Sequence, residues 1–415
     1  MDEKAAAASC LGWFVSENGE AAASYLEASI NILAGLTIFD LYPAVASSAV
    51  VALIQCVSGM LSLLEENYSW EQGKLNDIPA PVVNALELVF VQYDKIMKLT
   101  EQSIVRAAIE SVGKLSLMFG PTAVMGNMKK IVSWMIDIFT RKTAYQLNRE
   151  SFEENEEDFV TFTVVLDVIV EFSKTCGCLF VPFLPDLFNC FSAYFGDESP
   201  DEYKECCLCT IVEVAEEIDE AFSPFCSGFL PVAMRTMRPE SDDNVLQYAC
   251  SLLRQILIHG NPSEATANEI WAVVNAMMNL DPSRSILFDS LYGLVAQLVL
   301  SFPNLHPVEQ ILPTLVRNLP LRVNAEPSSV IYQCVFKYLD AGHLSVVNML
   351  PQIIELFIVE VASGDLTEET KQMQTHFLQN LAKNQTEQLD SIFNIVLQKE
   401  IVDQAALVQL RNILQ

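Results

Sequence analysis

Residues 344–363 read LSVVNMLPQIIELFIVEVAS, and this stretch contains the pattern that decides the fold. Its apolar residues recur at three- and four-residue steps, and they are Val346, Val347, Leu350, Ile353, Ile354 and Phe357. This spacing places them on one face of an α-helix. The stretch is therefore predicted to be a helix that buries one side and exposes the other.

The Leu-Pro pair inside this stretch recurs along the chain. The pairs lie at 184–185, 230–231, 312–313 and 350–351. Their prolines are 46, 82 and 38 residues apart, and the 82 is close to two periods of 41, with Ile270-Trp271 filling the empty slot. A fixed period of roughly 40–47 residues with two helices per period is typical of HEAT-type solenoids.

The period predicts an all-α, right-handed superhelical solenoid of HEAT repeats, in which 1–415 form a single array. We expect about nine helix pairs and one capping helix, since 415 residues exceed what a single compact core accommodates. The expected pairs are 2–18 and 20–36, 43–66 and 79–98, 101–119 and 121–142, 157–176 and 180–196, 200–222 and 224–238, 242–259 and 264–280, 283–301 and 307–319, 327–341 and 344–363, and 367–383 and 386–397. The capping helix is expected at about 400–414. In such pairs we expect the second helices to line the concave side.

Acidic residues outnumber basic residues by 53 to 24, which gives a net charge of −29. Residues 150–220 hold 19 acids and two bases, a net charge of −17. Such a field repels phosphate backbones and attracts basic proteins, so we expect a basic protein partner and no direct nucleic-acid binding. For acids scattered elsewhere, solubility is an equally good explanation.

Neither a membrane span nor a disulfide framework is indicated. The most apolar stretch, 179–195, contains Pro182, Pro185, Asp186 and Asn189, so we expect no membrane insertion. The eleven cysteines are scattered, mostly in apolar helical stretches, as reduced cysteines of intracellular proteins are. We expect the protein in the cytosol or nucleus.

One expected connection, residues 143–157, is long for a compact array. It contains the acids Glu153, Glu154, Glu156 and Glu157 and almost no apolar residue. This acidic inter-repeat loop is either a solvated linker or an arm that contacts basic cargo.

Three stretches together resemble the karyopherin-β nuclear import receptors, specifically the importin-4 branch. The first comprises residues 3–8, 17–19 and 25–27, the second is Arg141-Lys142-Thr143-Ala144 with Gln146, and the third is Asn318-Leu319-Pro320-Leu321-Arg322. Their order and spacing match the family along nearly the whole chain. One late family segment differs, because Ser290 and Gln297 stand where the family often has Asn and Arg.

The resemblance implies a function and a set of partners. The chain resembles the C-terminal, cargo-binding arch of such a receptor, which shuttles between cytoplasm and nucleus and needs no cofactor. Implied cargo is basic: core histones, most of all the histone 3/histone 4 pair, with their chaperone, and ribosomal proteins. Nucleoporins are further implied partners, and Ran-GTP would bind through an N-terminal half absent here.

Two Trp-containing pairs are candidate cargo sites. Trp271 and Asn275, and likewise Trp134 and Asp137, lie about one helical turn apart on expected second helices. A Trp face packs a Lys stem, and an amide or carboxylate nearby pairs with an extended basic peptide. Core packing of either Trp is the competing interpretation.

Further candidate carboxylates and amides stand on other expected second helices. Glu87 and Asp94 belong to the second pair, and Asp186 and Asn189 belong to the fourth. We expect them to pair with Lys or Arg of cargo. Because single exposed pairs contribute little, several would have to act together.

The sequence gives no support to an enzyme or a metal centre. Cys206 and Cys209 form a CxxC without a second ligand pair, and the four histidines stand far apart. An alternative function from another class is a HEAT-repeat scaffold subunit that joins folded protein partners.

Overall fold

The computed structural model describes residues 2–39, 41–64, 68–147, 156–364, 366, 368–399 and 402–414. Within these ranges the regular structure is entirely helical, so the predicted all-α class is confirmed. Apart from three four-residue helices, the described α-helices form nine pairs followed by one final helix, as the period predicted. The chain divides into two compact units, Met1–Phe222 and Ser223–Gln415.

The helices of the first unit are α1 (Asp2–Asn18), α2 (Leu26–Leu36), α3 (Pro43–Leu64), α4 (Ala80–Ile96), α5 (Gln102–Phe119), α6 (Thr122–Met125), α7 (Met128–Phe139), α8 (Ala144–Leu147), α9 (Glu156–Cys176), α10 (Leu184–Phe191) and α11 (Asp201–Ile218). Those of the second unit are α12 (Ser223–Thr236), α13 (Asp243–His259), α14 (Glu264–Met277), α15 (Ser285–Ser301), α16 (Val308–Arg317), α17 (Ser328–Asp340), α18 (Leu344–Val347), α19 (Leu350–Ser363), α20 (Glu368–Asn384), α21 (Thr386–Lys399) and α22 (Gln404–Leu414).

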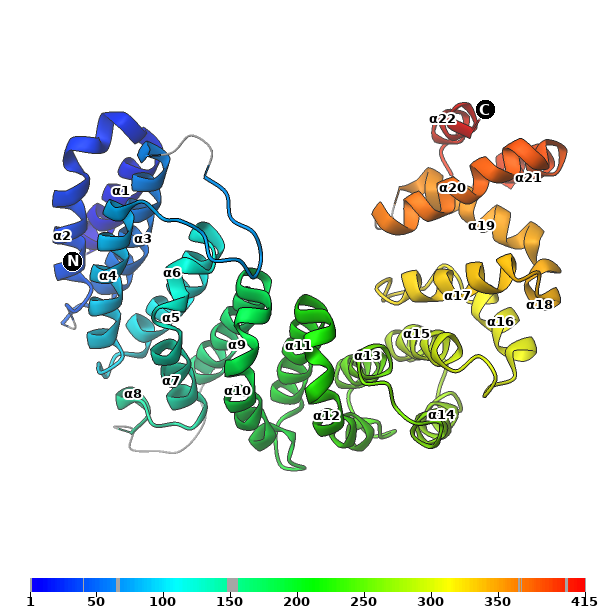
Figure 1. The fold of residues 1–415 in the computed structure, drawn as a ribbon, viewed down its shortest axis with the longest axis horizontal. Helices are drawn as coiled ribbons and strands as arrows, with labels where there is room; N and C mark the ends of the chain where they lie inside the picture. Colours follow the sequence, from blue (N-terminus) through cyan, green and yellow to red (C-terminus); the bar gives the residue numbers. More distant parts are fainter. Residues whose placement is uncertain are drawn as a thin grey trace. The chain divides into compact units, whose positions relative to one another are not determined.

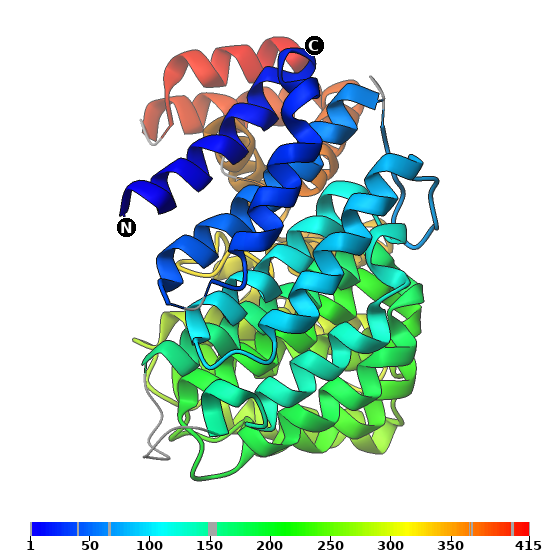
Figure 2. The same cartoon turned by 90° about the vertical axis from the view of Figure 1, so that its left-hand side faces the viewer.

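Each unit is built from two rows of helices. In the first unit, α1, α3, α5, α9 and α11 pack side by side in one row, and α2, α4, α7 and α10 form the other (Figures 1 and 2). In the second unit, α13, α15 and α17 form one row, and α12, α14, α16 and α19 form the other (Figure 1). Within each unit, the row that begins with α1 or α13 lies on the inner side of the unit's own curve.

This arrangement corrects one expectation. The second helices of the predicted pairs, such as α4, α7, α10 and α14, belong to the outer rows rather than the concave side (Figure 1). The reason is that the sequence period shows only that successive helices alternate between the two rows. It does not show which of the two rows lies on the concave side. The inner surface of the first unit is therefore made by the row that includes α5, α9 and α11.

Two of the four Leu-Pro pairs mark the beginning of a helix. Pro185 and Pro351 occupy the first turn of α10 and α19, where a missing N–H is harmless. The predicted helix 344–363 is consequently divided, with α18 ending at Val347 and α19 restarting at Leu350. Pro231 and Pro313 lie inside α12 and α16.

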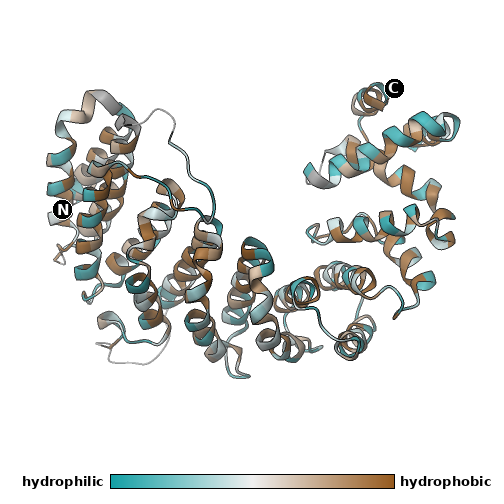
Figure 3. Ribbon diagram, in the orientation of Figure 1, coloured by the Kyte–Doolittle hydropathy of each residue, from teal (hydrophilic) through white to brown (hydrophobic). Residues whose placement is uncertain are grey.

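Apolar side chains fill the space between the rows, and hydrophobic residues recur on every helix (Figure 3). Phe119, Phe172, Phe180 and Phe357 are among the largest fully buried side chains. Burial of this kind against neighbouring repeats stabilises a solenoid without a central core.

One helix has the length and composition of a membrane span, although the sequence expectation named none. Residues 43–61 of α3 have a mean hydropathy of 1.9, and 56% of the apolar window is buried inside the structure. The helix packs against α1, α2 and α5, as a core helix of a repeat array does.

Candidate functional site

The inner row of the first unit carries a group of carboxylates, four of which act on one another. We define the acidic face as Glu110 on α5, Asp167 and Glu171 on α9, and Glu202, Glu205 and Glu213 on α11. Two lysines, Lys114 and Lys174, stand among them. All eight side chains are exposed or half-exposed. A net negative surface of this kind attracts cationic groups.

Glu171 is the most perturbed member of the acidic face. Its half-buried carboxylate lies over Gly113 of α5, where no side chain intervenes. Burial raises the pKa of Glu171 to about 7, and Asp167 and Glu110 add to the rise while Lys114 and Lys174 oppose it. A cationic ligand at this point would favour the ionised carboxylate.

The neighbouring carboxylates connect three helices electrostatically. Burial raises the pKa of Asp167, and the charges of Glu213 on α11 and Glu110 on α5 raise it further. Lys174 approaches Glu213 at 3.5 Å, and Lys114 approaches Glu110 at 2.6 Å. These exposed pairs are weak, so they leave the face available to other cations.

Cys206 at this face is a thiol of low reactivity. Burial raises the pKa of Cys206 to about 11, with the charges of Glu205, Asp167 and Glu202 adding to the rise. Cys209 lies 3.3 Å from Glu213 through its Sγ. Among the described residues, no group of three or more His, Cys, Asp or Glu side chains is arranged to hold a metal ion.

Trp271 and Asn275 both lie on α14 in the outer row of the second unit. The indole of Trp271 stacks on the His306 ring, with 4.4 Å between centroids, so one face of the indole is covered. Burial lowers the pKa of His306. Asn275 is exposed, and its backbone carbonyl accepts a hydrogen bond from the Asn279 amide.

Trp134 and Asp137 lie on α7 in the outer row of the first unit. Trp134 is only 7% exposed, so its ring packs in the core instead of facing solvent. Asp137 is half-exposed and lines a pocket of about 270 Å³ with Lys98 and Lys142.

The remaining predicted residues are also on outer-row helices. Glu87 and Asp94 lie on α4, and Asp186 and Asn189 lie on α10. Glu87, Asp186 and Asn189 are exposed, whereas Asp94 is paired with Lys98 at 3.2 Å. The structure thus places the eight predicted cargo residues on four separate outer helices.

The predicted acidic loop is only partly described. Glu153 and Glu154 lie outside the described residues. Glu156 and Glu157 begin α9, where acids in the first turn favour the helix dipole. Residues 144–147 form the short helix α8.

The segment that begins at Asp289, which departs from the family pattern, holds a connection between two helices in place. The Asp289 carboxylate accepts three backbone N–H bonds, from Arg322 at 3.1 Å, Val323 at 2.8 Å and Asn324 at 3.0 Å. Ser290 accepts a bond from the Asn324 amide at 3.2 Å. Asp289 therefore fastens the connection between α16 and α17 to α15.

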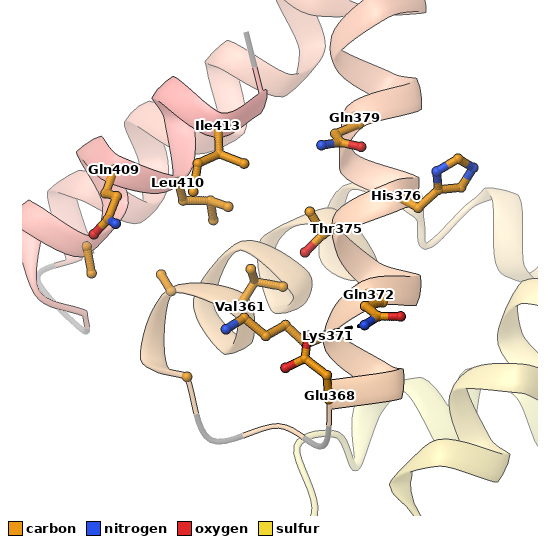
Figure 4. A pocket seen from close by; sticks show the side chains of 13 residues that line it. Val361, Glu368, Lys371, Gln372, Thr375, His376, Gln379, Gln409, Leu410 and Ile413 are labelled. Atoms are coloured by element: carbon orange, nitrogen blue, oxygen red, sulfur yellow. Dashed lines mark hydrogen bonds between the residues drawn. The ribbon is translucent and has the colours of Figure 1, made fainter. Parts of the chain in front are cut away.

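An open groove of about 700 Å³ lies between the end of α19, α20 and α22 (Figure 4). Among the described residues that line it, Glu368 and Lys371 carry opposite charges, while Gln372, Gln379 and Gln409 supply amides. This described lining has no excess of one charge, in contrast to the acidic face.

Sequence reasoning missed the acidic face because it selected the second helices. A usable signal was present, since Asp167, Glu171 and Lys174 recur at three- and four-residue steps. Such spacing puts all three on one exposed stripe of α9. The concentration of acids between 150 and 220 pointed to the same region.

Comparison with known proteins gives sequence relatives but no family model, since none matches the chain. The chain is 21% identical over 416 residues to probable importin subunit beta-4 of Schizosaccharomyces pombe, covering 94% of this chain and 38% of that protein. It is 22% identical over 179 residues to human importin-4, covering 43% of this chain and 16% of that protein. The chain thus spans well under half the length of these relatives.

Solved structures of Kap121p share the fold. Kap121p bound to RanGTP matches with a TM-score of 0.64 and 14% identity, covering 99% of this chain and 37% of that chain. Kap121p bound to the extreme C-terminus of the protein phosphatase Cdc14p matches with a TM-score of 0.62 and 16% identity, covering 99% of this chain and 36% of that chain. The predicted superhelical repeat fold and the resemblance to importin-4 proteins are confirmed.

Proposed function

We propose that this chain is the cargo-binding part of a nuclear import receptor of the importin-4 type, and that its acidic face binds basic protein segments. The observation that carries this proposal is the row of interacting carboxylates on α5, α9 and α11, on the inner side of the first unit. The similarity to two importins along this chain supports the transport role.

The proposed cargo is an extended, lysine-rich segment, foremost a core-histone tail of the histone 3/histone 4 pair. Ribosomal proteins and a histone chaperone are further proposed partners. Kap121p has been solved with RanGTP, Pho4p and Nup53p, which supports Ran, cargo and pore-protein partners for the complete receptor. Shuttling between cytoplasm and nucleus follows from this role.

Binding would work through the sum of several weak contacts. Each exposed ion pair contributes on the order of 0–1 kcal/mol, so affinity needs several lysines on the acidic face at once. The pKa values of Asp167 and Glu171 are both raised, and Glu171 stands out because its pKa is about 7, so that a bound ammonium would release a proton from it near neutral pH. Affinity should therefore rise with pH as Glu171 ionises.

The test is titration with a labelled core-histone tail peptide at about 50 and 200 mM salt. One variant combines Asp167→Asn, Glu171→Gln and Glu213→Gln on the acidic face. Its matched control combines Glu87→Gln, Asp94→Asn and Asp186→Asn, which removes the same charge from the outer-row carboxylates.

Salt-sensitive binding that only the acidic-face variant weakens, by about tenfold or more, supports the proposal. Loss in the control alone would move the site to the outer-row carboxylates. Absence of peptide binding at both salt concentrations would favour the scaffold alternative, in which folded partners bind.

A further inference from the structure

The connection between α3 and α4 does not turn directly back. Residues 68–79, here called the strap, cross the ends of α5 and α9 before the chain enters α4 (Figure 1). The strap has no regular secondary structure beyond a turn, so its conformation depends on contacts with other helices. These contacts go to three successive inner helices.

The first contacts of the strap are with the end of α5. Tyr68 donates its hydroxyl to the Phe119 carbonyl at 2.6 Å, and the Trp70 indole donates to the Leu117 carbonyl at 3.1 Å. The Asn76 amide also donates to the Phe119 carbonyl, at 3.1 Å. The strap thus supplies donors to carbonyls that α5 itself leaves without a helical partner.

The middle of the strap does the same for α9 and α11. The Gly73 amide donates to the Thr175 carbonyl at 2.9 Å. The side-chain amide of Gln72 donates to the Ser173 carbonyl at 3.1 Å and to the Glu217 carbonyl at 3.0 Å. Gln72 therefore joins the last turns of two helices, α9 and α11.

Two glycines make room for this path. Gly120 follows α5 with φ +74°, and a Cβ there would lie 2.7 Å from the Trp70 side chain. Gly177 follows α9 with φ +48°, and a Cβ there would lie 3.2 Å from Gln72. The positive φ values and the close approaches both favour glycine at these positions.

The strap contacts are at the ends of the helices that carry the acidic face. Glu217, which accepts from Gln72, lies one turn after Glu213 on α11. Ser173 and Thr175 follow Glu171 on α9. Because Gln72 bonds to both helices, sliding of α9 against α11 would strain or break these bonds.

We propose that the strap is a clamp that fixes the spacing of α5, α9 and α11, and that strap closure and ligand binding on the acidic face stabilise one another. The second half of this statement rests on the proposed function. Coupling of this kind is reciprocal: a ligand that spans the three helices favours the closed strap, and loss of the strap weakens that ligand.

The clamp is tested first without ligand, by hydrogen exchange of the Gly73 amide in the full chain. Gln72→Ala removes the two side-chain bonds of Gln72, to the Ser173 carbonyl on α9 and the Glu217 carbonyl on α11. The exchange rate of the Gly73 amide should then rise by about tenfold. The control is Leu75→Ala, since Leu75 is 66% exposed in the same strap. Equal exchange in Gln72→Ala and Leu75→Ala would overturn the clamp.

The coupling is tested by adding the core-histone tail peptide to the same experiment. Slower Gly73 exchange in the wild type, together with weaker peptide binding by Gln72→Ala than by Leu75→Ala, would support it. Peptide binding that leaves Gly73 exchange unchanged would overturn the coupling while the proposed function stands. No peptide binding would overturn the proposed function and the coupling, and the ligand-free measurement would still decide the clamp.

Discussion

Gly113 on α5 leaves the space that the carboxylate of Glu171 on α9 occupies. A Cβ at position 113 would lie 1.7 Å from Glu171 Oε2 and 2.9 Å from its Cδ. Because Gly113 has no side chain, the carboxylate of Glu171 in the next repeat can occupy its half-buried position. The relationship is specific enough to be broken by a single methyl group.

Gly113→Ala should move Glu171 into solvent and lower its pKa from about 7 toward its usual value of 4.5. The helix itself should gain up to about 1 kcal/mol from alanine in place of glycine, so the variant should remain folded. The measurement is an NMR titration of the Glu171 carboxyl. Gly126→Ala is the control, because nothing lies within 4 Å of a Cβ there. A Glu171 pKa that stays near 7 would contradict the account.

The free energy of unfolding should depend on pH through the raised pKa of Glu171. Its folded pKa of about 7 lies above its usual value of 4.5, so the folded state holds the proton more tightly. This contribution to the free energy of unfolding is fully present below pH 4.5 and is lost as pH rises through 7.

Glu171→Gln should remove that loss. At pH 8 the variant should be more stable than the wild type by on the order of 1 kcal/mol, discounted because solvent screens a half-buried carboxylate. The two proteins should converge near pH 4. Urea unfolding across the pH range measures the difference, and Glu87→Gln on α4 controls for removal of an exposed charge. A constant difference at all pH values would be inconsistent with this mechanism.

Most helices could be predicted because their information is local. Apolar spacing and proline positions placed the helix at 242–259, and the structure has α13 at Asp243–His259 with Asp242 as its cap. The choice between inner and outer rows was not local, since it depends on how repeats stack. For that reason the predicted cargo residues fell on outer helices and the carboxylates of α9 were passed over.

Asp289→Ala should loosen the connection between α16 and α17. The buried Asp289 carboxylate, 2% exposed, is the acceptor for the backbone amides of Arg322, Val323 and Asn324. Loss of a charged acceptor for these partly exposed donors costs on the order of 1–3 kcal/mol. We expect hydrogen exchange at residues 322–324 to accelerate at least tenfold. Asp281→Ala, on an exposed turn, should leave these three amides unchanged, and unaltered exchange in Asp289→Ala would refute the role.

Trp271→Ala separates packing from cargo binding at α14. Removing the indole from the His306 ring should hydrate the imidazole, so the His306 pKa should rise toward its usual value of 6.5. NMR titration of the imidazole measures this change. Asn275→Ala, four residues away, should leave it unaltered.

The same Trp271→Ala variant should bind the core-histone tail peptide as the wild type does. A clear loss of affinity would instead support the sequence-based prediction that Trp271 grips cargo. The two readouts are independent, because the His306 titration reports packing whether or not a peptide binds.

The strap could not be predicted from sequence. Residues 68–79 have no apolar periodicity, and their partners lie far along the chain, up to 145 positions away for Gln72 and Glu217. The glycines at 120 and 177 were visible, but each is also an ordinary way to end a helix. Only the folded chain shows that both admit the same segment.

The strap also limits the deletion, duplication and exchange of single repeats. In an ordinary solenoid each repeat touches only its neighbours, so repeats can be deleted, duplicated or exchanged one at a time. Here the second helix pair is bonded directly to the ends of α5, α9 and α11, which begin the third, fourth and fifth pairs. Removing or inserting one pair between α5 and α11 would leave the strap too long or too short. These four pairs are therefore expected to vary at their surface but not in their number of repeats.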